Sequence, residues 1–259
     1  MQISSTHRKF RLSPKHNSNM KLINILLAAI ILNGATALAQ TDTLYTQSGK
    51  ELIITPIKHA SMRIQFDGNE IEIDPVTQLP PVTDYATYPK ADYIFVTHEH
   101  FDHCDKTAVQ QLTSDGTVVI ANANAAKIIG TGEVMKNGES KDLGIIKVEA
   151  VPAYNNSPDK LQFHPKGRDN GYILTIDGLR LYIAGDTEDI EEMAAIKDID
   201  VAFLPCNLPY TMTPEQCAKA ARTFVPKILY PYHFSDTKIE RVAELLEGSG
   251  IEVRIRNFK

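Results

Sequence analysis

The most informative segment of this chain is Tyr93-Ile94-Phe95-Val96-Thr97-His98-Glu99-His100-Phe101-Asp102-His103. A short apolar run typical of a buried strand leads directly into three imidazoles and a carboxylate. His98 and His100 are two positions apart in an extended segment, so both side chains project to one side and can reach one cation. Asp102 and His103 follow where the chain turns toward a second position. Such ligands favour Zn²⁺ or a similar metal over Ca²⁺ or Mg²⁺, which prefer oxygen ligands.

The composition is that of an ordinary globular protein. The 259 residues include 27 Lys and Arg, 32 Asp and Glu, 14 Gly and 14 Pro, and 43% are hydrophobic. These values exclude a collagen-like chain, a disulfide scaffold and a disordered protein. The length is sufficient to bury a sizeable core. Because no linker-like stretch interrupts residues 40–259, we expect one domain there.

The N-terminal segment has the layout of a secretory signal peptide. Its first 39 residues contain five basic residues and no acid, an apolar run from Leu22 to Leu32, and the small-residue site Ala37-Leu38-Ala39. The apolar run is too short to span a membrane. We expect translation to start at Met20, so that residues 1–19 would come from an over-long gene model, and we expect cleavage of the leader to leave Gln40 as the first mature residue. The mature protein would then be periplasmic or secreted, with no stable membrane anchor.

The charge of the mature chain limits its partners. Without the leader, 22 basic side chains face 32 acidic ones, a formal net charge of −10. An acidic surface repels phosphate backbones, so nucleic acid is not an expected partner. We expect a small-molecule substrate. The sequence does not indicate an oligomeric state.

Alternating and helical patterns predict an α/β protein. Apolar or alternating runs predict strands at 62–66, 71–73, 93–97, 118–121, 145–151, 172–176, 181–184, 201–204, 228–230 and 253–255. Helical patterns occupy 106–112, 122–129, 190–196, 214–224 and 238–246.

One arrangement occurs twice along the chain. Asp67-Gly68 joins two predicted strands, the second of which ends at Asp74, and Asp177-Gly178 joins two more, the second of which ends at Asp186. Asp-Gly favours a hairpin turn because both residues tolerate positive φ. The recurrence predicts two similar halves packed together, with a chance repetition of a common turn as the alternative.

These motifs together carry a family resemblance. His-x-His-x-Asp-His over residues 98–103 resembles the signature of the metallo-β-lactamase superfamily. Tyr182–Thr187 is similar to the strand of that superfamily ending in a Gly-Asp whose carboxylate bridges two metals, and Tyr230–His233 resembles its late strand with the last histidine ligand. Three segments of this chain resemble one branch of the superfamily, which includes L-ascorbate-6-phosphate lactonase and N-acyl phosphatidylethanolamine phospholipase D. They are His59-Ala60-Ser61, Ile73-Asp74-Pro75 and 203–212. The resemblance covers roughly residues 52–235.

The resemblance implies a four-layer αβ/βα sandwich of two similar halves, with two divalent metal ions at one edge between the sheets. It implies six ligands: His98 and His100 at the first metal, Asp102, His103 and His233 at the second, and Asp186 shared. Zn²⁺ is the expected metal, with Mn²⁺ or Fe²⁺ as alternatives, because the same ligands suit all three.

The third ligand of the first metal departs from the family pattern. Family members have a histidine where this chain has Asn155, and an amide oxygen is a weak ligand for zinc. Either Asn155 holds the metal loosely or another side chain replaces it. His164, a few residues later, can fold back into the site as a ligand or as a substrate-pocket residue.

The predicted activity is metal-dependent hydrolysis of a small ester, lactone, phosphoester or amide by a metal-bridging hydroxide. Asp102 would pass a proton to the leaving group, and Tyr154 and Tyr210 are candidates to stabilise developing negative charge. Hydrolysis of β-lactams ranks lower, because lactamases typically have Cys where this chain has Asp186. A non-catalytic metal- or ligand-binding protein with a degenerate first site is the alternative, and Asn155 is the residue that supports it.

Overall fold

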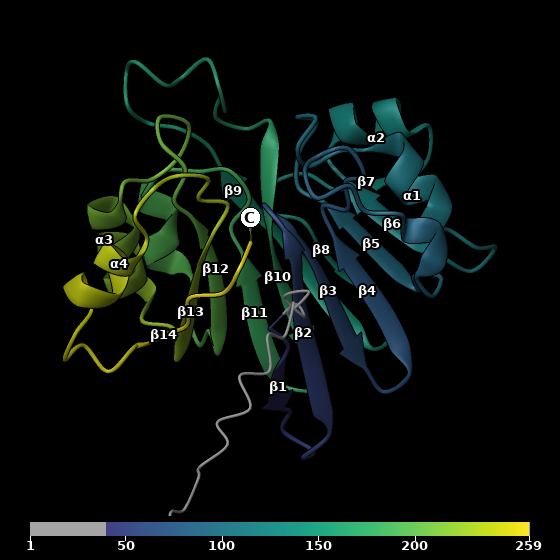
Figure 1. Cartoon of the computed structure of the whole chain (residues 1–259), viewed down its shortest axis with the longest axis horizontal. Helices are drawn as coiled ribbons and strands as arrows, with labels where there is room; N and C mark the ends of the chain where they lie inside the picture. The colour runs from purple at the N-terminus through teal and green to yellow at the C-terminus, as the bar shows by residue number, and fades with distance from the viewer. Residues whose placement is uncertain (1–39, 259) are drawn as a thin grey trace, which may run out of the picture. The chain divides into compact units, whose positions relative to one another are not determined.

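Two seven-stranded mixed sheets face each other in residues 40–258, the part of the chain that the computed structural model describes (Figure 1). Strand order in each sheet follows the sequence, so each half of the chain builds one sheet. The predicted leader, residues 1–39, lies outside the described residues. Within the described part, no helix combines the length and the apolar character needed to cross a membrane.

The two sheets have the same construction. The first contains β1 (Asp42–Tyr45), β2 (Glu51–Lys58), β3 (Ser61–Phe66), β4 (Asn69–Ile73), β5 (Tyr93–Val96), β6 (Val118–Ala121) and β7 (Glu133–Val134). The second contains β8 (Ser140–Asp142), β9 (Ile146–Ala153), β10 (Asp169–Ile176), β11 (Leu179–Ile183), β12 (Val201–Pro205), β13 (Ile228–Tyr232) and β14 (Glu252–Val253). In each sheet the first four strands pair antiparallel and the last four pair parallel. The predicted two similar halves are therefore confirmed.

Both Asp-Gly pairs form the hairpins that the sequence predicts. In the β3–β4 hairpin, φ is 50° at Asp67 and 79° at Gly68, and in the β10–β11 hairpin it is 44° at Asp177 and 78° at Gly178. Positive φ at both central residues matches the right-handed twist of the flanking strands. These two-residue turns set the register that carries β4 to Asp74 and β11 toward Asp186.

The main core lies between the sheets. Alternate residues of β2 point inward, where Leu52 and Ile54 are fully buried, and a similar alternation in β9 buries Val148. Nearly every residue of β10 is buried, including Leu174. Burial of each such side chain stabilises the fold by about 1.5–3 kcal/mol. A second apolar cluster fills the space between the outer face of the first sheet and its helices.

Helices cover the outer faces and complete four layers (Figure 1). They are α1 (Lys106–Leu112) and α2 (Ala123–Ile129) on the first sheet, and α3 (Pro214–Phe224) and α4 (Glu240–Leu245) on the second. Thr213 and Gln216 form a capping box at the start of α3. This architecture confirms the expected αβ/βα sandwich.

Some elements differ from the prediction. The predicted helix at 190–196 is a 3₁₀ turn, η2 (Glu191–Ala195), whose first turn has no side-chain cap. A second 3₁₀ turn, η1 (Tyr85–Thr87), and the strands β1, β2, β7 and β8 were not predicted. Of these strands, β7 and β8 have only two and three residues, too few to show a periodic pattern.

Candidate metal centre

The candidate metal-binding side chains lie where strands end. His98, Asp186 and His233 follow β5, β11 and β13, which run parallel to their neighbours β6, β12 and β14. The carboxyl ends of such strands meet at one edge of a sheet, and this is where open α/β sheets bind ligands. Residues far apart in the sequence therefore converge at the edge between the two sheets.

Three imidazole nitrogens form the first group. His98 Nε2 lies 3.1 Å from His100 Nδ1, and His164 Nε2 lies 3.2 Å from the same His100 atom. Tetrahedral coordination with metal–nitrogen bonds of about 2.05 Å separates ligand atoms by about 3.3 Å. The three nitrogens thus have a spacing that suits one metal ion, and His164 is one of them.

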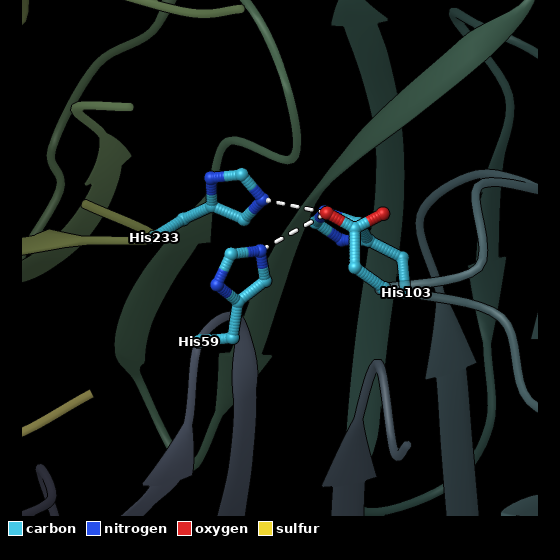
Figure 2. Close-up of side chains that lie close together, drawn as sticks. His59, His103 and His233 are labelled. Atoms are coloured by element: carbon cyan, nitrogen blue, oxygen red, sulfur yellow. Dashed lines mark hydrogen bonds and ion pairs between the residues drawn. The ribbon is translucent and has the colours of Figure 1, made fainter. Parts of the chain in front are cut away.

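A second group surrounds Asp102. His233 Nε2 lies 3.4 Å and His103 Nε2 4.0 Å from Asp102 Oδ2. His59 Nε2 contacts the same oxygen at 3.0 Å, and Figure 2 shows His59 and His233 both directed at this carboxylate beside His103. All four ligand atoms lie within 4.8 Å of one another.

Asp186 lies between the two groups and offers one oxygen to each. Its Oδ2 is 3.3 Å from His164 Nε2, whereas its Oδ1 is 3.4 Å from His103 Nε2 and 3.5 Å from His233 Nε2. A carboxylate with this placement can bridge two cations.

Several of these atoms lack the partners that buried polar groups require. Within residues 40–258, His103 Nε2, His233 Nε2 and Asp186 Oδ1 are buried and make no hydrogen bond. A buried unsatisfied polar group costs about 1–3 kcal/mol, and a charged group costs more. Three such atoms facing one point fit a cation that would satisfy them all.

The electrostatics also suit metal ligands, which must be deprotonated. Burial holds the pKa of His98 well below its usual range, and burial likewise lowers the pKa of His100. Burial opposes ionisation of Asp102 and Asp186, but the neighbouring imidazoles outweigh it and hold both carboxyl pKa values low. His103 is the exception: burial acts against its protonation, but the surrounding carboxylates raise its pKa well above the usual value, so a cation that binds this ring would displace a proton.

Comparison with known proteins agrees with this geometry. The family described as the β-lactamase superfamily domain matches residues 53–233. The chain belongs to the metallo-β-lactamase superfamily. A UPF0173 metal-dependent hydrolase from Lysinibacillus sphaericus is 32% identical over 210 residues, which cover 75% of this chain and 92% of the relative. A second protein of that name, from Ligilactobacillus salivarius, is 35% identical over 188 residues, covering 68% and 82%.

Two solved structures are similar as well. A protein from Parabacteroides distasonis that carries the name of a metal-dependent hydrolase is 55% identical with a TM-score of 0.83, over 85% of this chain and 100% of that one. Igni18, a metallo hydrolase from Ignicoccus hospitalis, is 25% identical with a TM-score of 0.67, over 80% and 95%.

Behind the ligand atoms of this metallo-β-lactamase superfamily protein, Asp74 and Thr97 orient two imidazoles. Asp74 Oδ2 lies 2.8 Å from His103 Nδ1 and accepts a hydrogen bond from the Thr97 hydroxyl at 2.7 Å. Thr97 Oγ1 is also 3.0 Å from His98 Nδ1. Such outer hydrogen bonds fix ring orientation and tautomer. The sequence placed Asp74 at the end of a strand, but it did not predict the contribution of Thr97.

The structure separates the roles of Asn155 and His164. Asn155 Oδ1 lies 3.3 Å from His164 Nδ1, on the side of the ring opposite Nε2, the nitrogen near His100. The Asn155 amide donates to the carbonyl oxygens of Tyr210, at 2.7 Å, and Lys160, at 3.3 Å. Asn155 therefore lies behind the His164 imidazole, whose Nε2 belongs to the first group with His98 and His100. It does not itself point into the group.

The two tyrosines predicted near the reaction differ in placement. The Tyr154 hydroxyl donates to Glu192 at 2.7 Å and accepts from Lys166 at 3.0 Å, so it is committed away from the cluster. Tyr210 lines the cavity in front of the cluster. Only Tyr210 is therefore positioned to contact a substrate.

Backbone strain accompanies the site in this superfamily member. His59, Asp74 and His233 have φ values of 51°, 43° and 48°, in the left-handed region that non-glycine residues rarely adopt. Gly185, at φ 64°, passes so close to β10 that an added Cβ would lie 2.8 Å from Asn170 O. Only glycine can therefore bring the chain to Asp186 along this path.

The cavity in front of the cluster has a volume of about 320 Å³. Its lining includes His100, Asp102, His164, Asp186 and His233. A larger cavity of about 470 Å³ lies beside η2 and contains none of these residues, so we assign the chemistry to the smaller one.

Proposed function

We propose that this protein is a hydrolase that uses two divalent cations, held in the two groups of ligand atoms and bridged by Asp186. The single observation that carries the proposal is the pair of ligand sets, with one Asp186 oxygen facing each. The relatives named metal-dependent hydrolases support it. Zn²⁺ is the proposed metal, with Mn²⁺ and Fe²⁺ as alternatives that the same ligands accept.

His98, His100 and His164 would hold the first ion, and Asp102, His103 and His233 the second. Bound there, two cations would supply hydroxide at neutral pH and polarise the carbonyl or phosphoryl oxygen of a substrate. Asp102 lines the cavity, and the low pKa of its carboxyl keeps it ionised. Its position in the cavity, and not its basicity, makes Asp102 the candidate to relay a proton from the attacking water to the leaving group, because a carboxylate of such low pKa is a weak base.

The proposed substrates are small esters, lactones, phosphoesters or amides. A cavity of about 320 Å³ fits a small molecule rather than a polymer. The resemblance of sequence segments to the branch with L-ascorbate-6-phosphate lactonase and N-acyl phosphatidylethanolamine phospholipase D favours lactone or phosphodiester chemistry over β-lactam hydrolysis. The predicted leader would place this reaction in the periplasm or outside the cell, which cell fractionation would test.

The alternative, a non-catalytic binding protein, depends on Asn155 leaving the first site incomplete. With His164 beside His98 and His100, that argument has no geometric support.

The test begins with metal-free protein, to which Zn²⁺, Mn²⁺ or Fe²⁺ is returned before assay with carboxylic esters, lactones, phosphodiesters and β-lactams. We expect two bound ions per chain and turnover of at least one ester or lactone. The His103→Ala variant should lose turnover while far-UV circular dichroism shows a folded chain. Stoichiometric metal without turnover of any substrate would instead support a binding protein.

A further inference from the structure

The cavity described above has an unusual lining for a hydrolase site that might take phosphate esters. Besides residues of the metal centre it is lined by Phe101, Phe163, Asn207 and Tyr210. Within residues 40–258, no lysine or arginine contributes to this lining. Sites that bind phosphate typically present Arg or Lys side chains or helix N-termini to it.

The nearest cations are already committed to other groups. Arg168 approaches His100 Nε2 at 3.4 Å, but its guanidinium donates to Asp169 at 2.7 and 2.9 Å and also pairs with Glu99 at 3.1 Å. Lys160 Nζ is held by Glu188 and by the Thr211 carbonyl oxygen, each at 2.9 Å. A negatively charged substrate group would therefore find no unpaired basic side chain at this site.

The mouth of the cavity is aromatic and exposed. Phe101 is 75% exposed and Tyr210 is 45% exposed, and the Phe163 ring meets the Tyr210 ring edge-on at a centroid distance of 5.0 Å. A cluster of exposed apolar side chains around a cavity marks a binding surface. We call Phe101, Phe163 and Tyr210 the aromatic rim.

Asn207 provides a polar group without a partner inside the cavity. It is only 6% exposed, and its backbone is fixed by hydrogen bonds with Thr211. Within residues 40–258 its carboxamide makes no hydrogen bond. Its amide is open to solvent in the cavity, so a substrate oxygen can take the place of water there.

Resting on the proposed function, we infer that the cavity selects substrates that carry no charge outside the scissile group, and that an apolar or aromatic group next to the scissile carbonyl packs on the aromatic rim. The Asn207 amide donates a hydrogen bond to an uncharged oxygen of the same substrate. Esters, lactones and amides with an apolar acyl group fit this site. Substrates that would place an anionic group against the aromatic rim do not.

Two substrates of equal length test the charge preference in the metal-loaded enzyme: 4-nitrophenyl hexanoate, and the mono-4-nitrophenyl ester of adipic acid, which ends in a carboxylate. We expect kcat/KM for the hexanoate to exceed that for the adipate by at least about tenfold. Phe101→Ser should raise KM for the hexanoate about tenfold and change the adipate little, because a lost aromatic side chain removes apolar contact. Equal or greater activity on the adipate would overturn the inference.

The matched control is Tyr45→Ser. Tyr45 is 67% exposed and pairs with Glu51, at the far end of β2 from Lys58 and His59. At about 3.3 Å per residue, it is more than 20 Å from that end of the strand. This variant should leave the preference for the hexanoate unchanged. A similar loss in the control and in Phe101→Ser would contradict a role for the aromatic rim.

A binding measurement separates this inference from the proposed function. Hexanamide is added to metal-free protein and its contact is followed by saturation-transfer NMR. Signal from the wild type that falls at least threefold in Phe101→Ser and Asn207→Ala supports the inference, even if no ester is hydrolysed and the proposed function fails. Absence of hexanamide binding to the wild type, or binding that is unchanged in Phe101→Ser, overturns the inference while leaving metal-dependent hydrolysis intact.

Discussion

Replacement of Asn155 by alanine should weaken the first metal position specifically. Among the candidate ligands, Asn155 has a side-chain contact with His164 alone, between Asn155 Oδ1 and His164 Nδ1 at 3.3 Å. Its amide is held in place by the Tyr210 and Lys160 carbonyl oxygens. Loss of a partner that orients a metal-binding imidazole typically lowers metal affinity 10–100-fold. This corresponds to about 1.4–2.7 kcal/mol of binding free energy.

The same substitution has a separate effect on folding. The Tyr210 carbonyl oxygen loses its 2.7 Å hydrogen bond, and a buried acceptor without a partner costs about 1–3 kcal/mol. Asn155→Asp keeps an oxygen near His164 but loses the amide donor. We therefore expect Asn155→Asp to retain metal affinity while sharing the loss of stability.

The assay is a titration of metal-free protein with Zn²⁺ in competition with a chromophoric chelator, alongside urea unfolding without metal. Asn137→Ala is the control. The Asn137 amide, like that of Asn155, hydrogen-bonds to buried structure, with Val151 O, Asp169 O and Asn170 Oδ1 as its acceptors, but it contacts no residue of the metal centre. The control variant should lower stability without changing metal affinity. If Asn155→Ala binds both ions as tightly as wild type does, the proposed orientation of His164 is wrong.

Three further predictions follow from contacts around the site. Burial raises the pKa of Glu188, but hydrogen bonds outweigh it and lower that pKa to about 2. The ionised carboxylate therefore stabilises the fold above the unfolded pKa near 4.5, and this stabilisation is lost as pH falls toward 2. Glu188→Gln should cost about 3 kcal/mol at pH 7 and roughly half of that at pH 3 in urea unfolding, and an equal cost at both pH values would refute this. Gly185→Ala should lower the free energy of unfolding by about 2 kcal/mol or more, because its Cβ would lie 2.8 Å from a backbone oxygen. Gly116→Ala, where an added Cβ would meet nothing within 4 Å, should change it by no more than about 0.5 kcal/mol, and similar losses in the two variants would show that the close approach is absent. Asp74→Ala should weaken binding of the second ion 10–100-fold in the chelator competition, and unchanged affinity would remove Asp74 from the support of the site.

The sequence was sufficient to predict the architecture, and to name six residues that the structure brings together at one edge, because their signals are local. His98-x-His100 follows an apolar strand, and Asp186 and His233 likewise follow apolar strands, so topology alone carries them to one edge. The two Asp-Gly turns indicated the internal repeat for the same reason.

Other parts of the site depend on packing between distant segments and have no sequence signature. His164 lies in a loop, and its burial and its contacts with Asn155, His100 and Asp186 distinguish it from a solvated histidine only once the chain is folded. Tyr154 follows β9 as predicted, but Lys166 and Glu192 draw its hydroxyl away from the cluster. Asn207 gave no signal, since what marks it is an amide that lines a cavity.

Anomalous diffraction at the zinc edge from crystals of the reconstituted protein tests the paired metal centre most directly. We predict two peaks per chain that both contact Asp186, one also bound by His98, His100 and His164, and the other by Asp102, His103 and His233. A single peak, or a first ion bound by Asn155 in place of His164, would contradict this account.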